Sequence, residues 1–154
     1  MRRFRFVTVF DLLIEYLREG RIRLDPTRHR RRVTYHDPCN YGRKAERRFG
    51  HGFFEEPRWI LDRCVSDWVD LYPNRTFQTC CGGGGGTLVT GYNEERIHYG
   101  RRKMDQIRAT GAETIVVPCH SCHAQLEALR DACGMPGLEV KYLWELVAEL
   151  LVLG

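Results

Sequence analysis

The stretch ETIVVPCHSCHAQL, residues 113–126, predicts a buried strand that leads directly into a helix. Residues 113–118 are rich in β-branched side chains and end at a proline, which is typical of a short strand. Ser121 is expected to cap the N-terminus of a helix that runs to about Cys133. Cys119 would then lie in the loop that follows the strand.

The chain from residue 26 onward repeats this alternation. Strands separated by helices of ten or more residues indicate a parallel sheet. We therefore predict an α/β fold: a three-layer, Rossmann-like parallel-sheet domain over residues 26–154. Besides the two elements above, strands are expected at 32–37, 68–73 and 138–143, and helices at 57–68 (starting at Pro57), 94–110 (ending at Gly111) and 144–153.

Residues 1–25 are predicted to form an amphipathic helix that could be the tail of an upstream domain. The apolar run is interrupted by Asp11 and Glu15, so we do not interpret it as a signal peptide. No stretch approaches 18 consecutive apolar residues, so we expect no transmembrane segment and a cytoplasmic protein. The predicted apolar face consists of Val9, Leu12, Leu13, Tyr16 and Leu17.

The net charge of +4 is modest. It comes largely from two arginine-rich runs, residues 2–5 and 28–32. Aromatic residues are not interleaved with these arginines, and the basic area is small for a nucleic-acid footprint. We expect a solvated linker or docking surface there, and no nucleic-acid partner.

Seven cysteines are unusual for a chain with an ordinary apolar content of 43%. Loops that follow parallel strands emerge at the same carboxyl edge of the sheet, which is where ligands bind. Cys64 and Cys133 fall on helices and are expected to be small buried hydrophobes. The other five lie in loops after strands or, for Cys122, at the start of the following helix, and are predicted to meet at one place: Cys39, Cys80, Cys81, Cys119 and Cys122.

Several chemistries suit part of this pattern. A thioredoxin-like C-x-x-C pair uses two thiols and leaves three unexplained. The C-x-x-C-H run matches a haem attachment site, but a strand joined to its helix there leaves little room for a macrocycle. Zinc would use four ligands: Cys39, one of the adjacent pair, Cys119 and Cys122. An iron–sulfur cluster can use all five sulfurs, because adjacent thiolates can bind different irons. We favour the cluster and keep zinc as the alternative.

The run Gly82–Gly86 follows the adjacent cysteines. It satisfies neither the P-loop pattern nor G-x-G-x-x-G. We expect Gly82, Gly83 and Gly84 to bind the cofactor, because backbone without side chains can approach an inorganic core and direct N–H groups at it. Other polar residues near the cysteines are expected to tune or orient the site: His36, His120 and His123, with Asp37 and Asn40 orienting the loop, and Arg43 and Arg101 offsetting negative charge.

Three segments together resemble the cysteine-rich CCG domain found in the heterodisulfide reductase B/D family. They are HDPCNYGR (36–43), PNRTFQTCCGGGGG (73–86) and GAETIVVPCHSC (111–122). The same domain occurs in the iron–sulfur component of glycolate oxidase and in heterodisulfide-reductase-like components of membrane redox complexes. The resemblance covers roughly residues 33–151, and the five cysteines fill every place of the family pattern.

The resemblance implies a [4Fe–4S] cluster, non-cubane in the family, that cleaves or forms a disulfide. It also implies a ferredoxin-like or flavin electron-transfer partner and a place at the cytoplasmic face of a membrane complex. The rival hypothesis is a non-catalytic module, with zinc or no metal, that docks onto redox subunits.

Overall fold

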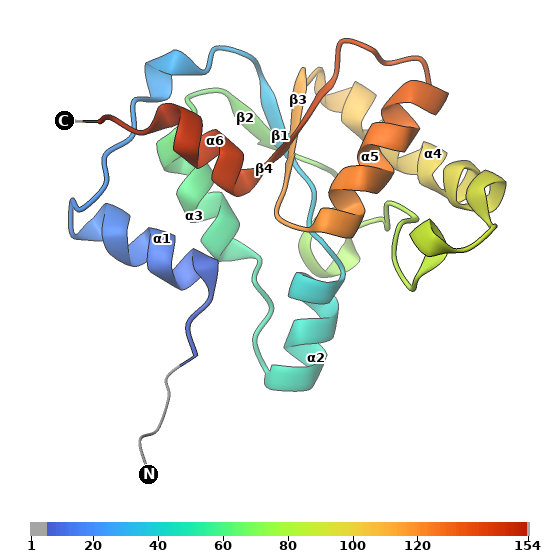
Figure 1. Ribbon diagram of the computed structural model, residues 1–154, viewed down its shortest axis with the longest axis horizontal. Helices are drawn as coiled ribbons and strands as arrows, with labels where there is room; N and C mark the ends of the chain where they lie inside the picture. The colour runs from blue at the N-terminus through green and yellow to red at the C-terminus, as the bar shows by residue number, and fades with distance from the viewer. Residues whose placement is uncertain (1–5, 154) are drawn as a thin grey trace.

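The computed structural model describes residues 6–153 and shows a parallel sheet between two layers of helices (Figure 1). The sheet has four strands in the order β2–β1–β3–β4, and all three pairings are parallel. The prediction of an α/β parallel-sheet fold is confirmed. The strands are β1 (Val33–Tyr35), β2 (Trp68–Asp70), β3 (Thr114–Val117) and β4 (Glu139–Tyr142).

The two central strands are buried, as expected where helices cover both faces. Tyr35 of β1 lies beside Asp70 of β2 and Val116 of β3, so the strands end at nearly the same level. The His36 N–H donates to the carbonyl of Val116 at 3.0 Å and extends the pairing one residue past β1. The loops after β1, β2 and β3 therefore leave the sheet at one edge.

Three helices cover one face of the sheet: α1 (Val9–Arg18), α3 (Glu55–Cys64) and α6 (Leu143–Leu150). Val33 and Tyr35 of β1 point to this face, where they pack with Ile60 and with Leu146. Cys64, the last residue of α3, is fully buried in the same cluster, which confirms its predicted role as a small core residue.

Two longer helices cover the opposite face: α4 (Asn93–Thr110) and α5 (His120–Ala132). Ile115 and Val117 of β3 pack there against buried residues of both helices. The helices approach closely at Gly100, where a Cβ would lie 2.6 Å from Leu129 Cδ2. Cys133 caps the C-terminus of α5 and is only partly buried, so its predicted core role holds in part.

The loop after Cys39 contains a helix that the sequence did not predict. It begins as a π-helical segment, Asn40–Lys44, and continues as α2 (Ala45–Phe49). A Cβ at Gly42 would lie 2.5 Å from Phe54 Cε1, so the segment packs directly on the phenylalanine that precedes α3. Short 3₁₀ segments occur at Pro26–Arg28, Arg75–Phe77 and Thr87–Val89.

Two predicted helix starts were wrong. The N-cap of α5 is Cys119, and Ser121 lies inside the first turn. Helix α3 begins at Glu55, so Pro57 is its third residue rather than its first. Proline is tolerated there because the first turn of a helix has N–H groups without intrahelical partners.

The N-terminal helix is shorter than predicted, and only part of the predicted apolar face packs on the core. Phe10 is buried in the cluster that contains β1, and Leu13 and Ile14 pack beside it, while Val9 and Leu12 are exposed. The arginines of residues 2–5 lie outside the described residues. Within residues 6–153, none of the helices has the length and hydrophobicity needed to span a bilayer.

A buried ion cluster ties the ends of β1 and β2 to α3. Arg58 of α3 is 4% exposed and makes bidentate pairs with Asp37 (2.8 and 2.9 Å) and with Asp70 (2.7 and 3.0 Å). Asp37 also accepts from the Arg75 N–H at 2.8 Å. Because Asp37 follows β1 and Asp70 ends β2, one guanidinium fixes both strand ends at the edge from which the cysteine loops emerge.

Replacing Arg58 with Met is expected to destabilise the metal-free protein by about 3–5 kcal/mol, because the buried Asp37 carboxylate would lose its charged partner. Chemical denaturation measures the free energy of unfolding. The matched control is Arg47→Met on α2, where the side chain is exposed. Equal stability of the two variants would contradict the role of the ion cluster.

Candidate metal centre

Three loops and the start of α5 bring five cysteines around one cavity. Its volume is about 290 Å³, including the part open to solvent. Ser121, Gln78 and Gly84 line it together with the sulfurs. All seven cysteines of the chain are free thiols. The cavity, called the cysteine pocket below, contains the five residues that the sequence predicted to meet: Cys39, Cys80, Cys81, Cys119 and Cys122.

The five sulfurs form a row in which each thiol acts on the pKa of the next. Their order is Cys39, Cys80, Cys81, Cys122 and Cys119. The pKa of Cys80 is lowered far below its usual value, because Cys39 and Cys81 both donate to its sulfur. The pKa of Cys39 is raised in turn, because its S–H is the donor. The row therefore favours thiolates, the form that binds metals.

Cys119 is the second sulfur favoured as a thiolate. The S–H of Cys122 and, more weakly, the backbone N–H groups of Cys122 and Ser121 at the start of α5 lower the pKa of Cys119 to about 6, although burial opposes them. Helix N-termini stabilise thiolates in this way. At neutral pH the pocket thus presents negative charge both at Cys80 and at Cys119.

The five cysteines of the pocket differ in exposure. Cys81, Cys119 and Cys122 are buried, whereas Cys39 is partly exposed and Cys80 is exposed. A group bound in the pocket would therefore be reached from solvent past Cys39 and Cys80.

The glycines after the adjacent cysteines have two different surroundings. The Gly82 N–H donates to Cys80 Sγ at 3.4 Å. A Cβ at Gly83 would lie 2.6 Å from Gln125 Cβ and 2.8 Å from the Ser121 carbonyl oxygen, so this glycine lets the loop pack against α5. Gly84 borders the pocket, 3.9 Å from Cys39 Sγ at its Cβ position. Their predicted role in cofactor binding stays a prediction.

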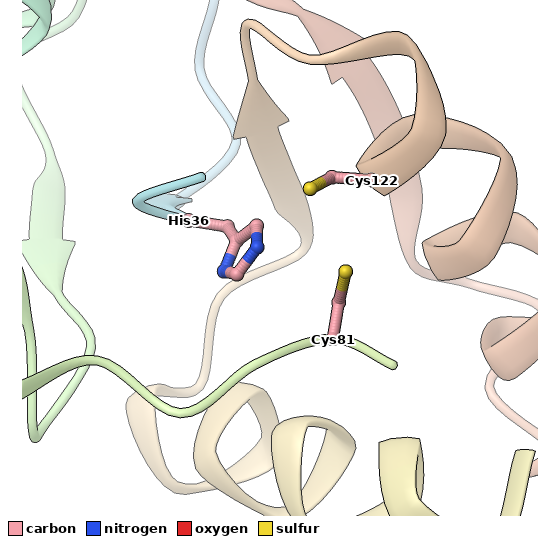
Figure 2. Close-up of side chains that lie close together, drawn as sticks. All are labelled: His36, Cys81 and Cys122. Atoms are coloured by element: carbon pink, nitrogen blue, oxygen red, sulfur yellow. The ribbon is translucent and has the colours of Figure 1, made fainter. Parts of the chain in front are cut away.

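His36 lies within the site itself, whereas the sequence indicated only a position near the cysteines. Figure 2 shows its ring directed toward Cys81 and Cys122. One ligand atom from each of the three residues lies within 4.8 Å of the others. His36 is 1% exposed, its Nδ1 has no hydrogen-bond partner among the described residues, and burial lowers its pKa well below 6.5. A neutral imidazole is therefore available to a bound metal.

The other predicted accessory residues have varied positions. Asp37 holds its loop through its paired contacts with Arg58, whereas Asn40 is exposed. Arg43 donates to the carbonyl oxygens of Thr76 and Gln78 and so braces the loop that leads to Cys80.

The two histidines beside the C-x-x-C pair contact an aromatic side chain of β4. His120 Nδ1 lies 2.6 Å from the Tyr142 hydroxyl, and the His123 ring stacks on the Tyr142 ring at 4.1 Å. These contacts anchor the first turn of α5 to β4.

Sequence reasoning missed Lys103. Arg101, which we expected to offset negative charge, is exposed, while Lys103 on the same helix is fully buried. One signal was available, because Lys103 stands at a buried position of α4 in step with Gly100 and Ile107.

The profile of the cysteine-rich CCG domain matches residues 33–127. The chain belongs to the CCG cysteine-rich domain family. The match begins at β1 and ends within α5, so it includes every residue of the cysteine pocket. No solved structure gave a significant match to the chain.

Several curated relatives of this CCG domain are named as ferredoxins or iron–sulfur proteins. A probable membrane-anchored ferredoxin of Chromohalobacter salexigens is 37% identical over 145 residues, which is 94% of this chain and 20% of that protein. An Hdr-like menaquinol oxidoreductase iron-sulfur subunit of Archaeoglobus profundus is 30% identical over 96% of this chain and 27% of its own length. A component of the dihydromethanophenazine:CoB–CoM heterodisulfide reductase of Methanosarcina mazei is 30% identical over 96% of this chain and 34% of its own.

The chain thus spans between a fifth and about a third of the length of these relatives. Their names support an iron–sulfur cofactor for the domain, without specifying the type of cluster.

The buried His36 predicts how acid affects the metal-free protein. As pH falls below 6.5, the unfolded chain takes up a proton on His36 that the folded protein excludes, so the free energy of unfolding decreases. A single proton contributes a slope of up to about 1.4 kcal/mol per pH unit.

Denaturation at a series of pH values under reducing conditions measures this slope. His36→Gln is expected to flatten it, and His98→Gln, at an exposed position of α4, is expected to leave it unchanged. The same slope in the wild type and in His36→Gln would show that His36 accepts a proton without unfolding.

Proposed function

We propose that this domain binds a [4Fe–4S] cluster through Cys39, Cys80, Cys81, Cys119 and Cys122 and serves electron transfer or disulfide reduction in a heterodisulfide-reductase-like complex. The observation that carries the proposal is the unbroken row of five free sulfurs around one cavity. The names of the relatives agree with it.

The residues present fit such a cluster better than a single four-coordinate ion. Thiolate ligands suit iron–sulfur clusters, and five sulfurs exceed the four ligands of a structural zinc site. The adjacent Cys80 and Cys81 differ in exposure, with Cys80 exposed and Cys81 buried, and adjacent thiolates can bind different irons of one cluster. The Gly82 N–H directed at Cys80 is the type of contact that tunes a cluster's potential.

When bound, a cluster of this kind would supply single electrons to a substrate. The protein's own part would be to bury three of the sulfurs and to leave the Cys39–Cys80 side open for an approaching disulfide. The overall reaction would be RS–SR + 2 e⁻ + 2 H⁺ → 2 RSH. The two electrons would come from a ferredoxin-like or flavin-containing partner, at the cytoplasmic face of a membrane-associated complex.

A second candidate function rests on the His36 geometry. His36, Cys81 and Cys122 form a compact buried set that suits one zinc ion with a fourth ligand. This set differs from the four cysteines that the sequence suggested for zinc. A zinc-bound domain would be a non-catalytic module that docks onto redox subunits.

Anaerobic reconstitution followed by iron, sulfide and zinc analysis separates the two functions. We expect about four irons and four sulfides per chain, as a [4Fe–4S] cluster requires, and an EPR signal after reduction. Cys81→Ala should reduce iron content and abolish that signal, whereas Cys133→Ala, a partly exposed cysteine outside the pocket, should match the wild type. One zinc per chain and no sulfide would reject the cluster and favour the docking module.

A further inference from the structure

Lys103 is a buried cation without a partner. It lies in the middle of α4 with 0% of its surface exposed, and its Nζ has no hydrogen-bond partner among residues 6–153. Its neighbours on the same side of the helix are Gly100, Met104 and Ile107, which are buried as well. An uncompensated ammonium in such a position is unfavourable, and an apolar side chain of the same length would fit the surroundings better.

The surroundings of Lys103 show which negative charges it faces. Burial lowers its pKa to about 8, and four groups oppose this effect, in the order Cys81, Asp37, Cys80 and Cys122. Three of these four are sulfurs of the cysteine pocket. Asp37 already has a bidentate partner in Arg58, so its charge is largely neutralised. The sulfurs of the pocket are therefore the main negative groups that the Lys103 ammonium faces.

Other positive groups near the pocket are partly or fully exposed to solvent, or are uncharged. Arg43 is engaged by two backbone carbonyls, and Arg96 donates to Gln125 and Asn93. His36 is held neutral by burial and by Lys103 itself, which together lower its pKa. Lys44 is exposed, where solvent screens its charge. Among these described groups, Lys103 is thus the fully buried positive charge that can act on the sulfurs of the pocket.

We propose that Lys103 is the internal counter-charge of the metal centre: its buried ammonium stabilises the more negative reduced state and raises the midpoint potential. The proposal rests on the proposed cluster. A thiolate-ligated cluster gains one negative charge on reduction, and net charge and burial are two of the factors that set cluster potentials. A fixed positive charge in a low-dielectric interior acts strongly on that step.

The test compares Lys103→Met with Lys103→Arg, which keeps the charge, and with Arg101→Met, which removes an exposed charge from the same helix. The first measurement is chemical denaturation of the metal-free proteins. Lys103→Met should be at least as stable as the wild type, because it replaces an uncompensated buried charge with an apolar side chain. Should it fail to fold, Lys103→Gln provides a second neutral variant.

The second measurement is an EPR-monitored redox titration of the reconstituted proteins. We expect Lys103→Met to shift the reduction equilibrium at least tenfold toward the oxidised form, a decrease of about 59 mV for one electron. The midpoint potential of Lys103→Arg should stay close to that of the wild type, and Arg101→Met should change it little. A folded Lys103→Met protein that takes up no iron would also support the counter-charge, provided that Lys103→Arg takes it up.

Two outcomes would overturn the inference, and they differ from a failure of the proposed function. If the wild type binds its cluster and Lys103→Met titrates at the same potential, Lys103 is not the counter-charge. If metal-free Lys103→Met is much less stable than the wild type and Lys103→Gln behaves alike, the lysine has a structural role. A wild type that binds no iron would instead reject the cluster itself.

Discussion

The paired contacts of Arg58 with Asp37 and Asp70 are the interaction on which the rest of the structure depends. Parallel strands bring their following loops to one edge of the sheet, but that geometry alone leaves the loops free to separate. The buried guanidinium joins the residue after β1 to the last residue of β2, and Asp37 also holds the backbone of Arg75. Cys39 comes shortly after Asp37, and the adjacent cysteines lie in the connection after Asp70, so both cysteine segments start from a fixed strand end.

The end of β1 places different charges on the two faces of the sheet. Successive residues of an extended chain point to opposite sides of a sheet. Asp37 faces α3 and meets Arg58, whereas His36 faces the cysteine pocket, on the face of the sheet that is covered by α4 with its buried Lys103. On the face covered by α3, the charge of Asp37 is neutralised by Arg58 of the protein itself. The second face holds the Lys103 ammonium and a row of thiols, two of which are favoured as thiolates, so its charge balance depends on the ionisation of the sulfurs and on the group bound there.

The sequence predicted the sheet and the meeting of the five cysteines because both follow from local patterns. Alternation of β-rich runs with long helices specifies parallel strands, and the relevant cysteines lie in loops after strands or, for Cys122, in the first turn of the helix that follows one. The sequence predicted that Leu13 of α1 faces the core but missed Phe10 and Ile14, because the neighbouring apolar residues have the same helical spacing. It missed the helix after Cys39, which depends on contact with Phe54. Lys103 was missed because a lysine in a charged helix is most often solvated, and its burial depends on the tertiary packing of α4.

The central claim is that all five sulfurs bind one group together. An anaerobic crystal structure of the reconstituted protein, with anomalous data at the iron edge, tests this most directly. We predict several iron sites inside the cavity, with each of the five Sγ atoms at bonding distance from at least one of them. A single anomalous site at the zinc edge between His36, Cys81 and Cys122, with Cys39 and Cys80 unbound, would contradict it.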